Sequence, residues 1–191
     1  MTSDAVTRVL ALLEEAPARC GGTKVVAVDG RSGSGKTTLA EALGAELEAP
    51  VVSLEYLYGG WDGLERGLGL LVTEVLGPLS RGRTARVPRY DWVRDTWDEP
   101  WLLSPPDTLV IEGVGAGARR AAAYASVLVW LEAAASVRKK RALDRDGETF
   151  APHWDRWAAA EDAMLARERT PDRADLVIGS RAGGTTTTPP T

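Results

Sequence analysis

The sequence has 191 residues, of which 44% are hydrophobic and 26% are charged, and it carries a net charge of −4. This length suits one domain with a core of its own. The acidic balance argues against a domain that binds duplex nucleic acid, because such domains are usually basic. Cys20 is the only cysteine, so no disulfide can form within the chain, and His153 is the only histidine, which argues against a histidine-rich metal site and a Ser/His/Asp triad.

The first residues predict an amphipathic helix rather than a targeting segment. Apolar residues recur at helical spacing from Val6 to Leu13, and Pro17 ends the pattern. This segment lacks the basic start of a signal peptide. The longest apolar stretch, Ser126–Ala135, is interrupted by Glu132 and is too short to span a bilayer. We therefore expect a cytoplasmic protein that does not contact membranes.

Strands and helices then alternate along the chain. Lys24–Val28 is a short β-branched run that predicts a buried strand, and after a Gly/Ser-rich turn the leucine spacing predicts a helix at Lys36–Glu48. Beyond Pro50, the pattern predicts a strand at Val51–Leu54, a loop at Glu55–Gly63 and a helix at Leu64–Leu79.

The second half continues the alternation. We expect an extended segment at Arg83–Trp92, a loop at Trp97–Pro106, a strand at Thr108–Ile111, a short helix at Ala118–Ala123 and a strand at Val127–Leu131. Two helices, Ser136–Asp146 and His153–Arg169, and a last strand, Asp175–Ile178, follow. The Gly/Thr/Pro composition of Gly183–Thr191 predicts a disordered tail.

This order of elements predicts an α/β fold. The strands are continuous apolar runs, which is typical of a parallel sheet covered by helices on both faces. Together with the phosphate-binding motif described next, it predicts the three-layer sandwich of P-loop NTPases, with a helical lid at about 136–150. We expect one kinase-type domain over 1–182 and a tail over 183–191.

A phosphate-binding motif lies between the first strand and the helix after it. Gly30-Arg-Ser-Gly-Ser-Gly-Lys36-Thr37 matches G-x-x-x-x-G-K-[ST] at every fixed position. Glycines let several backbone N–H groups converge on phosphates, and the start of a helix adds partial positive charge. The motif predicts ATP and Mg²⁺ as cofactors, with the nucleotide held by Gly30, Ser32, Gly33, Ser34, Gly35, Lys36, Thr37 and Thr38.

A second glycine-rich segment offers a competing interpretation. Gly113-Val-Gly115-Ala-Gly-Ala118 fits the looser dinucleotide pattern G-x-G-x-x-[GA] and follows an expected strand. Its literal implication is a site for NAD. The alternative is a flexible connection beneath the nucleotide site.

Two acidic residues are candidates for the metal and one for the base. Thr37 and Glu112, which ends a buried strand, are the expected Mg²⁺ ligands, and Asp29 is an alternative. Phosphoryl transfer to a hydroxyl needs a base near the acceptor oxygen. Glu55 follows the second strand and is the candidate base, and Lys36 is expected to contact the β- and γ-phosphates.

Aromatic and basic residues complete the expected site. Tyr58 and Trp61 could stack on a base, and Asp62 could accept from sugar hydroxyls. The segment containing Tyr90, Asp91 and Trp92 offers further aromatic and acidic side chains for the same contacts. Arg138, Arg141 and Arg145 are spaced to share a helix face, where guanidinium groups can neutralise charge on a transferring phosphoryl group.

With these motifs, the chain resembles the uridine kinase (uridine–cytidine kinase) family of P-loop kinases over about 25–178. Besides the P-loop, the resemblance rests on Glu55-Tyr-Leu-Tyr58, Pro88-Arg-Tyr90-Asp91, Glu112-Gly113 and the basic helix that carries Arg138, Arg141, Arg145 and Asp146. It implies an ATP-dependent kinase whose acceptor is a nucleoside such as uridine or cytidine.

The resemblance also implies roles for individual residues. Glu55 would deprotonate the 5′-hydroxyl, Tyr58 and Tyr90 would line the nucleoside pocket, and Asp62 would hold the ribose. Arg138, Arg141 and Arg145 would close over the phosphates. The chain departs from the family pattern where Glu55 replaces an aspartate and Asp95 stands in place of a base-reading histidine.

These departures leave two alternatives open. One is a kinase with a different acceptor, such as a nucleoside monophosphate or another small alcohol. The other is a P-loop protein that binds ATP in a regulatory role. The sequence contains no Asn-Lys-x-Asp motif for guanine and no Leu-Ser-Gly-Gly motif of transporter ATPases, which argues against both of those classes.

Overall fold

The computed structural model describes residues 2–179, apart from the side chains of residues 145–151. Five strands form one sheet in the order β2-β5-β1-β6-β7, and every neighbouring pair is parallel. The strands are β1 (Lys24–Gly30), β2 (Val51–Ser53), β5 (Thr108–Glu112), β6 (Val127–Leu131) and β7 (Leu176–Ile178). The expected parallel sheet is confirmed, and β1 at its centre is almost entirely buried.

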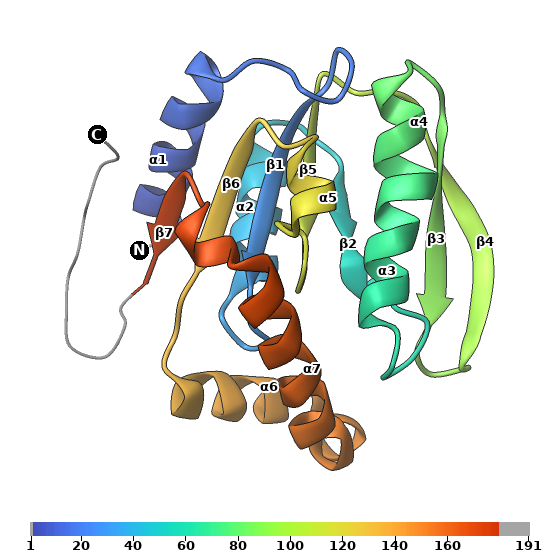
Figure 1. The fold of residues 1–191 in the computed structure, drawn as a ribbon, viewed down its shortest axis with the longest axis vertical. Coiled ribbons are helices and arrows are strands. Elements are labelled where there is room, and N and C mark those ends of the chain that lie inside the picture. Colours follow the sequence, from blue (N-terminus) through green and yellow to red (C-terminus); the bar gives the residue numbers. More distant parts are fainter. Residues whose placement is uncertain (1, 180–191) are drawn as a thin grey trace.

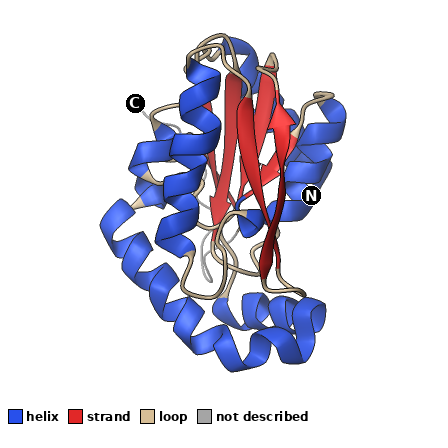
Figure 2. Cartoon of the chain, turned by 90° about the vertical axis from the view of Figure 1, so that its right-hand side faces the viewer, coloured by secondary structure: helices blue, strands red, loops and turns tan. Residues whose placement is uncertain are grey.

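Helices cover both faces of this sheet and make three layers (Figures 1 and 2). Alternate side chains of β1 point to opposite faces. Val26 and Val28 belong to the core under α1 (Thr2–Glu15) and α2 (Lys36–Glu46), whereas Val25 and Ala27 belong to the core of the other face. The α/β sandwich predicted from the alternating elements is therefore the observed architecture.

The predicted helix at 64–79 is present but is not a regular α-helix. It consists of α3 (Leu64–Leu70), the π-helical segment η2 (Leu71–Leu76) and α4 (Gly77–Ser80). The N–H of Gly77 donates to the carbonyl of Val72, which is the wider π spacing. Pro78 has no N–H to donate, and its ring disfavours a regular α-helical turn before it. The wider turn therefore lies where proline already interrupts the i→i−4 hydrogen bonds of the helix.

The prediction of a loop at 97–106 is wrong for residues 97–103. Residues Thr96–Leu103 form β4, which pairs antiparallel with β3 (Ala85–Asp91) and makes a two-stranded hairpin beside α3 and α4 (Figure 1). The register shifts between Val87 and Arg89, next to Pro88. Such an irregularity is where a sheet tolerates a proline, because no ladder hydrogen bond is required of it.

The C-terminal part supplies the lid and the helix that follows it. After α5 (Arg119–Ala122) and β6, α6 (Ala135–Phe150) covers the predicted lid, and the 3₁₀ turn η3 (Ala151–His153) leads into α7 (Trp154–Glu168). Figure 1 shows α6 crossing below the sheet and α7 returning toward it. The predicted tail at 183–191 lies outside the described residues. Among the helices that the structure describes, none has the length and apolar character to cross a bilayer.

Candidate active site

The phosphate-binding motif adopts the strand–loop–helix arrangement that its sequence predicts. β1 ends at Gly30, α2 begins at Lys36, and Gly35 between them has a φ of 100°, which a residue with a side chain rarely adopts. The loop is tight, because the N–H of Ser34 donates to the carbonyl of Arg31 at 3.1 Å. The ammonium of Lys36 donates to the same carbonyl at 3.2 Å, so the cation lies beside the loop.

Gly33 brings this loop into backbone contact with the lid helix α6. Its φ is 77°, and a Cβ at this position would lie 2.8 Å from the carbonyl carbon of Arg138. Only glycine therefore allows the loop and α6 to approach as closely as they do. The lid helix predicted from the basic residues is in place against the phosphate loop.

An open cleft of about 600 Å³ begins at the loop and extends toward β2 and the hairpin. One half is lined by the loop and the start of α2, and it contains Ser32, Gly33, Gly35, Lys36, Thr37 and Thr38. The other half, which we call the acceptor half, is lined by Glu55, Tyr58, Trp61, Trp92, Val114 and Trp157. Of the predicted nucleotide-binding residues, Gly30 and Ser34 belong to the loop but do not line the cleft.

Glu55 lies in the acceptor half on the 3₁₀ turn η1 (Leu54–Tyr56). The hydroxyl of Ser53 accepts from the N–H of Glu55 at 3.3 Å and thereby caps the turn. The carbonyl of Glu55 accepts from the indole N–H of Trp92 at 2.9 Å, which ties the hairpin to the turn. The structure thus places the candidate base in the same cleft as the phosphate loop.

Tyr58 is a buried wall of the acceptor half. Its hydroxyl donates to the carbonyl of Val114 at 3.0 Å, and its ring meets the ring of Trp157 edge-on with the centroids 5.0 Å apart. Burial, and after it the negative charges of Glu55 and Glu112 nearby, hold the pKa of Tyr58 well above its usual value. The hydroxyl is therefore a neutral donor at every physiological pH.

Two predicted acceptor-binding residues do not line the cleft. Asp62 is exposed and forms an ion pair with Arg156 of α7. Tyr90 belongs to the hairpin, where its hydroxyl donates to the carboxylate of Asp95. Asp62 was predicted because a carboxylate can accept from sugar hydroxyls, and Tyr90 because of the resemblance to uridine kinases, but the cleft is lined by the neighbouring Trp61 and Trp92 instead.

The predicted row of arginines divides between two environments. Arg141 lines the cleft. Arg138 is buried behind the loop, where its guanidinium donates to the carbonyl of Ala133 at 3.1 Å and to that of Ser32 at 3.3 Å. Burial and the nearby Arg31 lower the pKa of Arg138, and Glu161 opposes this effect. The side chain of Arg145 lies outside the described residues.

The donor set for a magnesium ion is one hydroxyl and one carboxylate. Thr37 lines the phosphate half of the cleft, and Glu112 ends β5 as a buried residue whose strand neighbours are Val28 and Ser53. Mg²⁺ commonly takes one or two protein oxygens together with phosphate oxygens and water. Both residues offer oxygen donors of the kind that Mg²⁺ takes, although only Thr37 lines the cleft.

Asp29, the alternative metal ligand, is instead engaged by backbone N–H groups. One carboxylate oxygen accepts from Gly30 at 2.7 Å and from Gly115 at 3.0 Å, and the other accepts from Gly117 at 3.0 Å. Burial raises the pKa of Asp29 above its usual value, although these three N–H groups and Lys36 partly oppose this effect. Asp29 thus fixes the segment after β5 to the end of β1.

The same contacts argue against the dinucleotide interpretation of the second glycine-rich segment. Its pattern requires backbone N–H groups that point at a pyrophosphate at the start of a helix. Two of those N–H groups, on Gly115 and Gly117, are donated to Asp29, and the helix that follows, α5, has four residues. The segment is the connection beneath the nucleotide site that the sequence left as the alternative.

Glu161 and Trp157 on α7 are part of the site and were not singled out from the sequence. The carboxylate of Glu161 accepts from the backbone N–H of Ser32 and from the indole N–H of Trp157, both at 2.9 Å. The available signal was the spacing of Trp154, Trp157 and Glu161, which lie on one helix face and are all buried.

Comparisons with known proteins give a fold but no sequence family. No family model matches the chain, and no curated protein matches it. A solved structure described as a possible uridine kinase from Bacillus stearothermophilus matches with a TM-score of 0.69 and 22% identity, over 93% of this chain and 98% of that one. A proposed fructose transport system kinase from Silicibacter sp. TM1040 matches with a TM-score of 0.60 and 22% identity, over 94% and 99%. The chain has the fold of P-loop kinases.

Proposed function

We propose that this protein is an ATP-dependent kinase that transfers the γ-phosphoryl group of ATP to a hydroxyl of a small molecule. One observation carries the proposal. A single cleft of about 600 Å³ is lined both by the phosphate loop and by a carboxylate, Glu55, together with aromatic rings. Phosphoryl transfer needs those two components to face one another across a space that both reactants share.

The residues of the cleft have complementary tasks in this reaction. The loop and the first N–H groups of α2 bind the phosphates, and Lys36 places a positive charge at their oxygens. Thr37 and Glu112 would hold Mg²⁺, which neutralises phosphate charge when it is bound. Glu55 orients the acceptor hydroxyl and accepts its proton as the oxygen attacks. Arg141 balances the negative charge that moves with the phosphoryl group.

The favoured acceptor is a nucleoside such as uridine or cytidine. The acceptor half contains rings of Tyr58, Trp61, Trp92 and Trp157, on which a flat base can stack. The resemblance to uridine kinases and the likeness of the fold to a possible uridine kinase agree with this choice. A nucleoside monophosphate or another small alcohol is the alternative acceptor, and an ATP-binding protein with a regulatory role is the alternative function.

The test is ADP release from ATP–Mg²⁺ in the presence of nucleosides, nucleoside monophosphates and small alcohols, with Lys36→Ala as the control. Release that rises with uridine or cytidine, and that the control loses, supports the proposal. A rise with a different acceptor retains the kinase and rejects the nucleoside. ATP binding without any acceptor that stimulates ADP release would reject the kinase and favour the regulatory protein.

A further inference from the structure

One side chain contacts both halves of the cleft. The ring of Trp157 lines the acceptor half, where it packs edge-on against Tyr58 and against Trp61 with centroids 5.0 Å and 6.2 Å apart. Its indole N–H points the other way and donates to the hydroxyl of Ser32 in the phosphate loop at 3.0 Å. Trp92, another ring of the acceptor half, instead donates its indole N–H to the carbonyl of Glu55.

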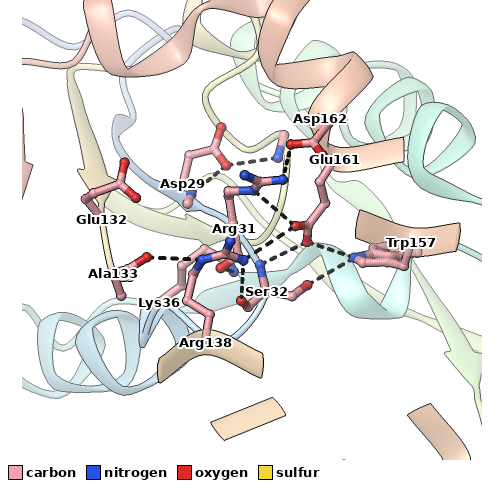
Figure 3. Close-up of polar contacts among 12 residues, drawn as sticks. Asp29, Arg31, Ser32, Lys36, Glu132, Ala133, Arg138, Trp157, Glu161 and Asp162 are labelled. Atoms are coloured by element: carbon pink, nitrogen blue, oxygen red, sulfur yellow. Dashed lines mark hydrogen bonds and ion pairs between the residues drawn. The ribbon is translucent and has the colours of Figure 1, made fainter. Parts of the chain in front are cut away.

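Glu161, one helical turn further along α7, reinforces this link. Its carboxylate accepts the same indole N–H and the backbone N–H of Ser32, both at 2.9 Å. The second carboxylate oxygen lies 3.5 Å from the Nε of Arg31 and 4.0 Å from a guanidinium nitrogen of Arg138. Figure 3 shows Glu161 and Trp157 directed at Arg31 and Ser32 of the loop.

Burial of the Glu161 carboxylate costs free energy unless its partners are in place. Glu161 is 2% exposed, and a buried carboxylate is tolerated only when it is paired and hydrogen-bonded. The loop residues Arg31 and Ser32 supply part of that pairing, and α6 supplies the rest through Arg138. If the phosphate loop loosens, Trp157 loses the Ser32 hydroxyl as an acceptor and Glu161 loses the N–H of Ser32, so only the bond between Trp157 and Glu161 within α7 remains.

We propose that Trp157 and Glu161 are positioning residues that couple the phosphate loop to the acceptor half of the cleft. The inference rests on the proposed kinase function. When a nucleotide orders the loop, Ser32 is fixed, and through it the indole of Trp157 is fixed as a wall of the acceptor half. The acceptor then binds to a wall that is already ordered, so nucleotide and acceptor favour each other's binding.

The experiment uses hydrogen exchange of the full chain with and without AMP-PNP–Mg²⁺, so it needs no knowledge of the acceptor. In the unmodified chain, the nucleotide should slow amide exchange at residues 30–38 and also in α7 around residues 157–165, there by at least about fivefold, the lower end of usual coupling factors. In Trp157→Phe, which keeps a ring in the wall and loses the N–H, protection should remain at 30–38 and become weaker in α7, where Glu161 still accepts from the backbone N–H of Ser32.

Trp92→Phe is the matched control. Trp92 lines the same half of the cleft, and its indole N–H makes a hydrogen bond of 2.9 Å, against 3.0 Å for the bond from Trp157 to Ser32, but to the carbonyl of Glu55 and not to the loop. This variant should keep the protection of α7. Ser32→Ala removes one of the two acceptors of the Trp157 N–H without altering α7, so it should reduce the protection part-way and serves if Trp157→Phe does not fold.

The outcomes separate the inference from the function beneath it. If the unmodified chain does not bind AMP-PNP–Mg²⁺, the kinase proposal fails and the coupling fails with it. If the nucleotide binds but protects only residues 30–38, the coupling alone is wrong. Equal loss of α7 protection in Trp157→Phe and Trp92→Phe would also overturn it, because the loss would then follow from any change in the wall.

Discussion

Replacing Gly33 by alanine tests the close contact between the phosphate loop and the lid helix. Gly33 has a φ of 77°, and a Cβ there would meet the backbone of Arg138, with the carbonyl carbon at 2.8 Å where ordinary contact begins at 3.4 Å. Backbone cannot rotate away as the end of a flexible side chain can. The loop and α6 must therefore separate, and the hydrogen bond from Arg138 to the carbonyl of Ser32 lies across that contact.

The expected loss in free energy of unfolding has two parts, and a substitution at a second glycine measures one of them alone. A residue with a Cβ in the left-handed region costs about 1–2 kcal/mol. Overpacking adds about 1–3 kcal/mol, including the loss of a hydrogen bond worth about 1 kcal/mol. Gly82 has a similar φ of 67° but no atom within 4 Å of its would-be Cβ, so Gly82→Ala should show the first part alone. We expect Gly33→Ala to lose about 2–5 kcal/mol and Gly82→Ala about 1–2 kcal/mol.

Urea unfolding of both variants measures the difference directly, provided that the slope m is unchanged. In thermal unfolding, each kcal/mol should lower Tm by about 2–4 °C for a protein of this size. Affinity for AMP-PNP–Mg²⁺ should fall in Gly33→Ala and remain in Gly82→Ala. If the two variants lose the same free energy of unfolding within about 0.5 kcal/mol, the loop does not rest against α6 and the reasoning is refuted.

Three further changes have defined outcomes. Glu55→Gln should lower acceptor-dependent ADP release by about 10²–10⁴-fold with AMP-PNP affinity unchanged, and a normal rate would show that Glu55 is not the base. Tyr58→Phe should lower the free energy of unfolding by about 1–3 kcal/mol, because it removes the donor to the Val114 carbonyl; urea unfolding checks this, and no loss would contradict that bond. Burial raises the pKa of Glu168, but the N–H of Arg119 and the side chain of Arg167 lower it more, and it lies below its ordinary value of 4.5. A lowered pKa adds stability above about pH 4.5 that is lost as the pH falls through the folded-state value. Glu168→Gln should therefore have a lower free energy of unfolding than the unmodified chain at neutral pH, and the difference should become smaller in acid. A difference that does not depend on pH would contradict a lowered pKa of Glu168.

The sheet and the phosphate loop were predictable because their signals are local. Lys24–Val28 and Thr108–Ile111 are short apolar runs, and the loop motif has fixed positions within eight residues. The hairpin strand β4 was missed for an equally local reason. Pro100 inside the strand and Pro105–Pro106 after it predict a loop. The strand forms because it pairs with β3 on both sides of the register shift next to Val87, and this pairing cannot be read from the local sequence.

Arg138 and Arg141 lie in different environments because helical spacing states which residues share a face, not what lies opposite that face. Residues three apart are neighbours on a helix, but they are offset around its axis. Here that offset is enough to direct Arg138 at the carbonyl of Ser32 and Arg141 into the cleft. Burial of Arg138 depends on the approach of the loop at Gly33, which no pattern within α6 encodes.

The two glycine-rich segments show most clearly what sequence cannot decide. Both follow buried strands and both supply glycines for close approach, so a pattern alone predicts a phosphate site at each. The structure distinguishes them by where their N–H groups go. In the segment after β5, Gly115 and Gly117 donate to Asp29. In the loop after β1, Gly30 donates to Asp29 and Ser32 to Glu161, but among the described residues no side chain caps the N–H groups at the start of α2.

This difference favours the start of α2 as the anion site. Within the described part of the chain, no side chain caps the start of α2, so its first N–H groups and Lys36 face the cleft that an ATP phosphate would enter. The partners that decide the matter, Asp29 and Glu161, lie 86 and 129 residues from the N–H groups of Gly115 and Ser32 that they accept. The second glycine-rich segment has the N–H groups of Gly115 and Gly117 satisfied by Asp29, whereas no described side chain caps the start of α2, and this favours the first motif as the phosphate site.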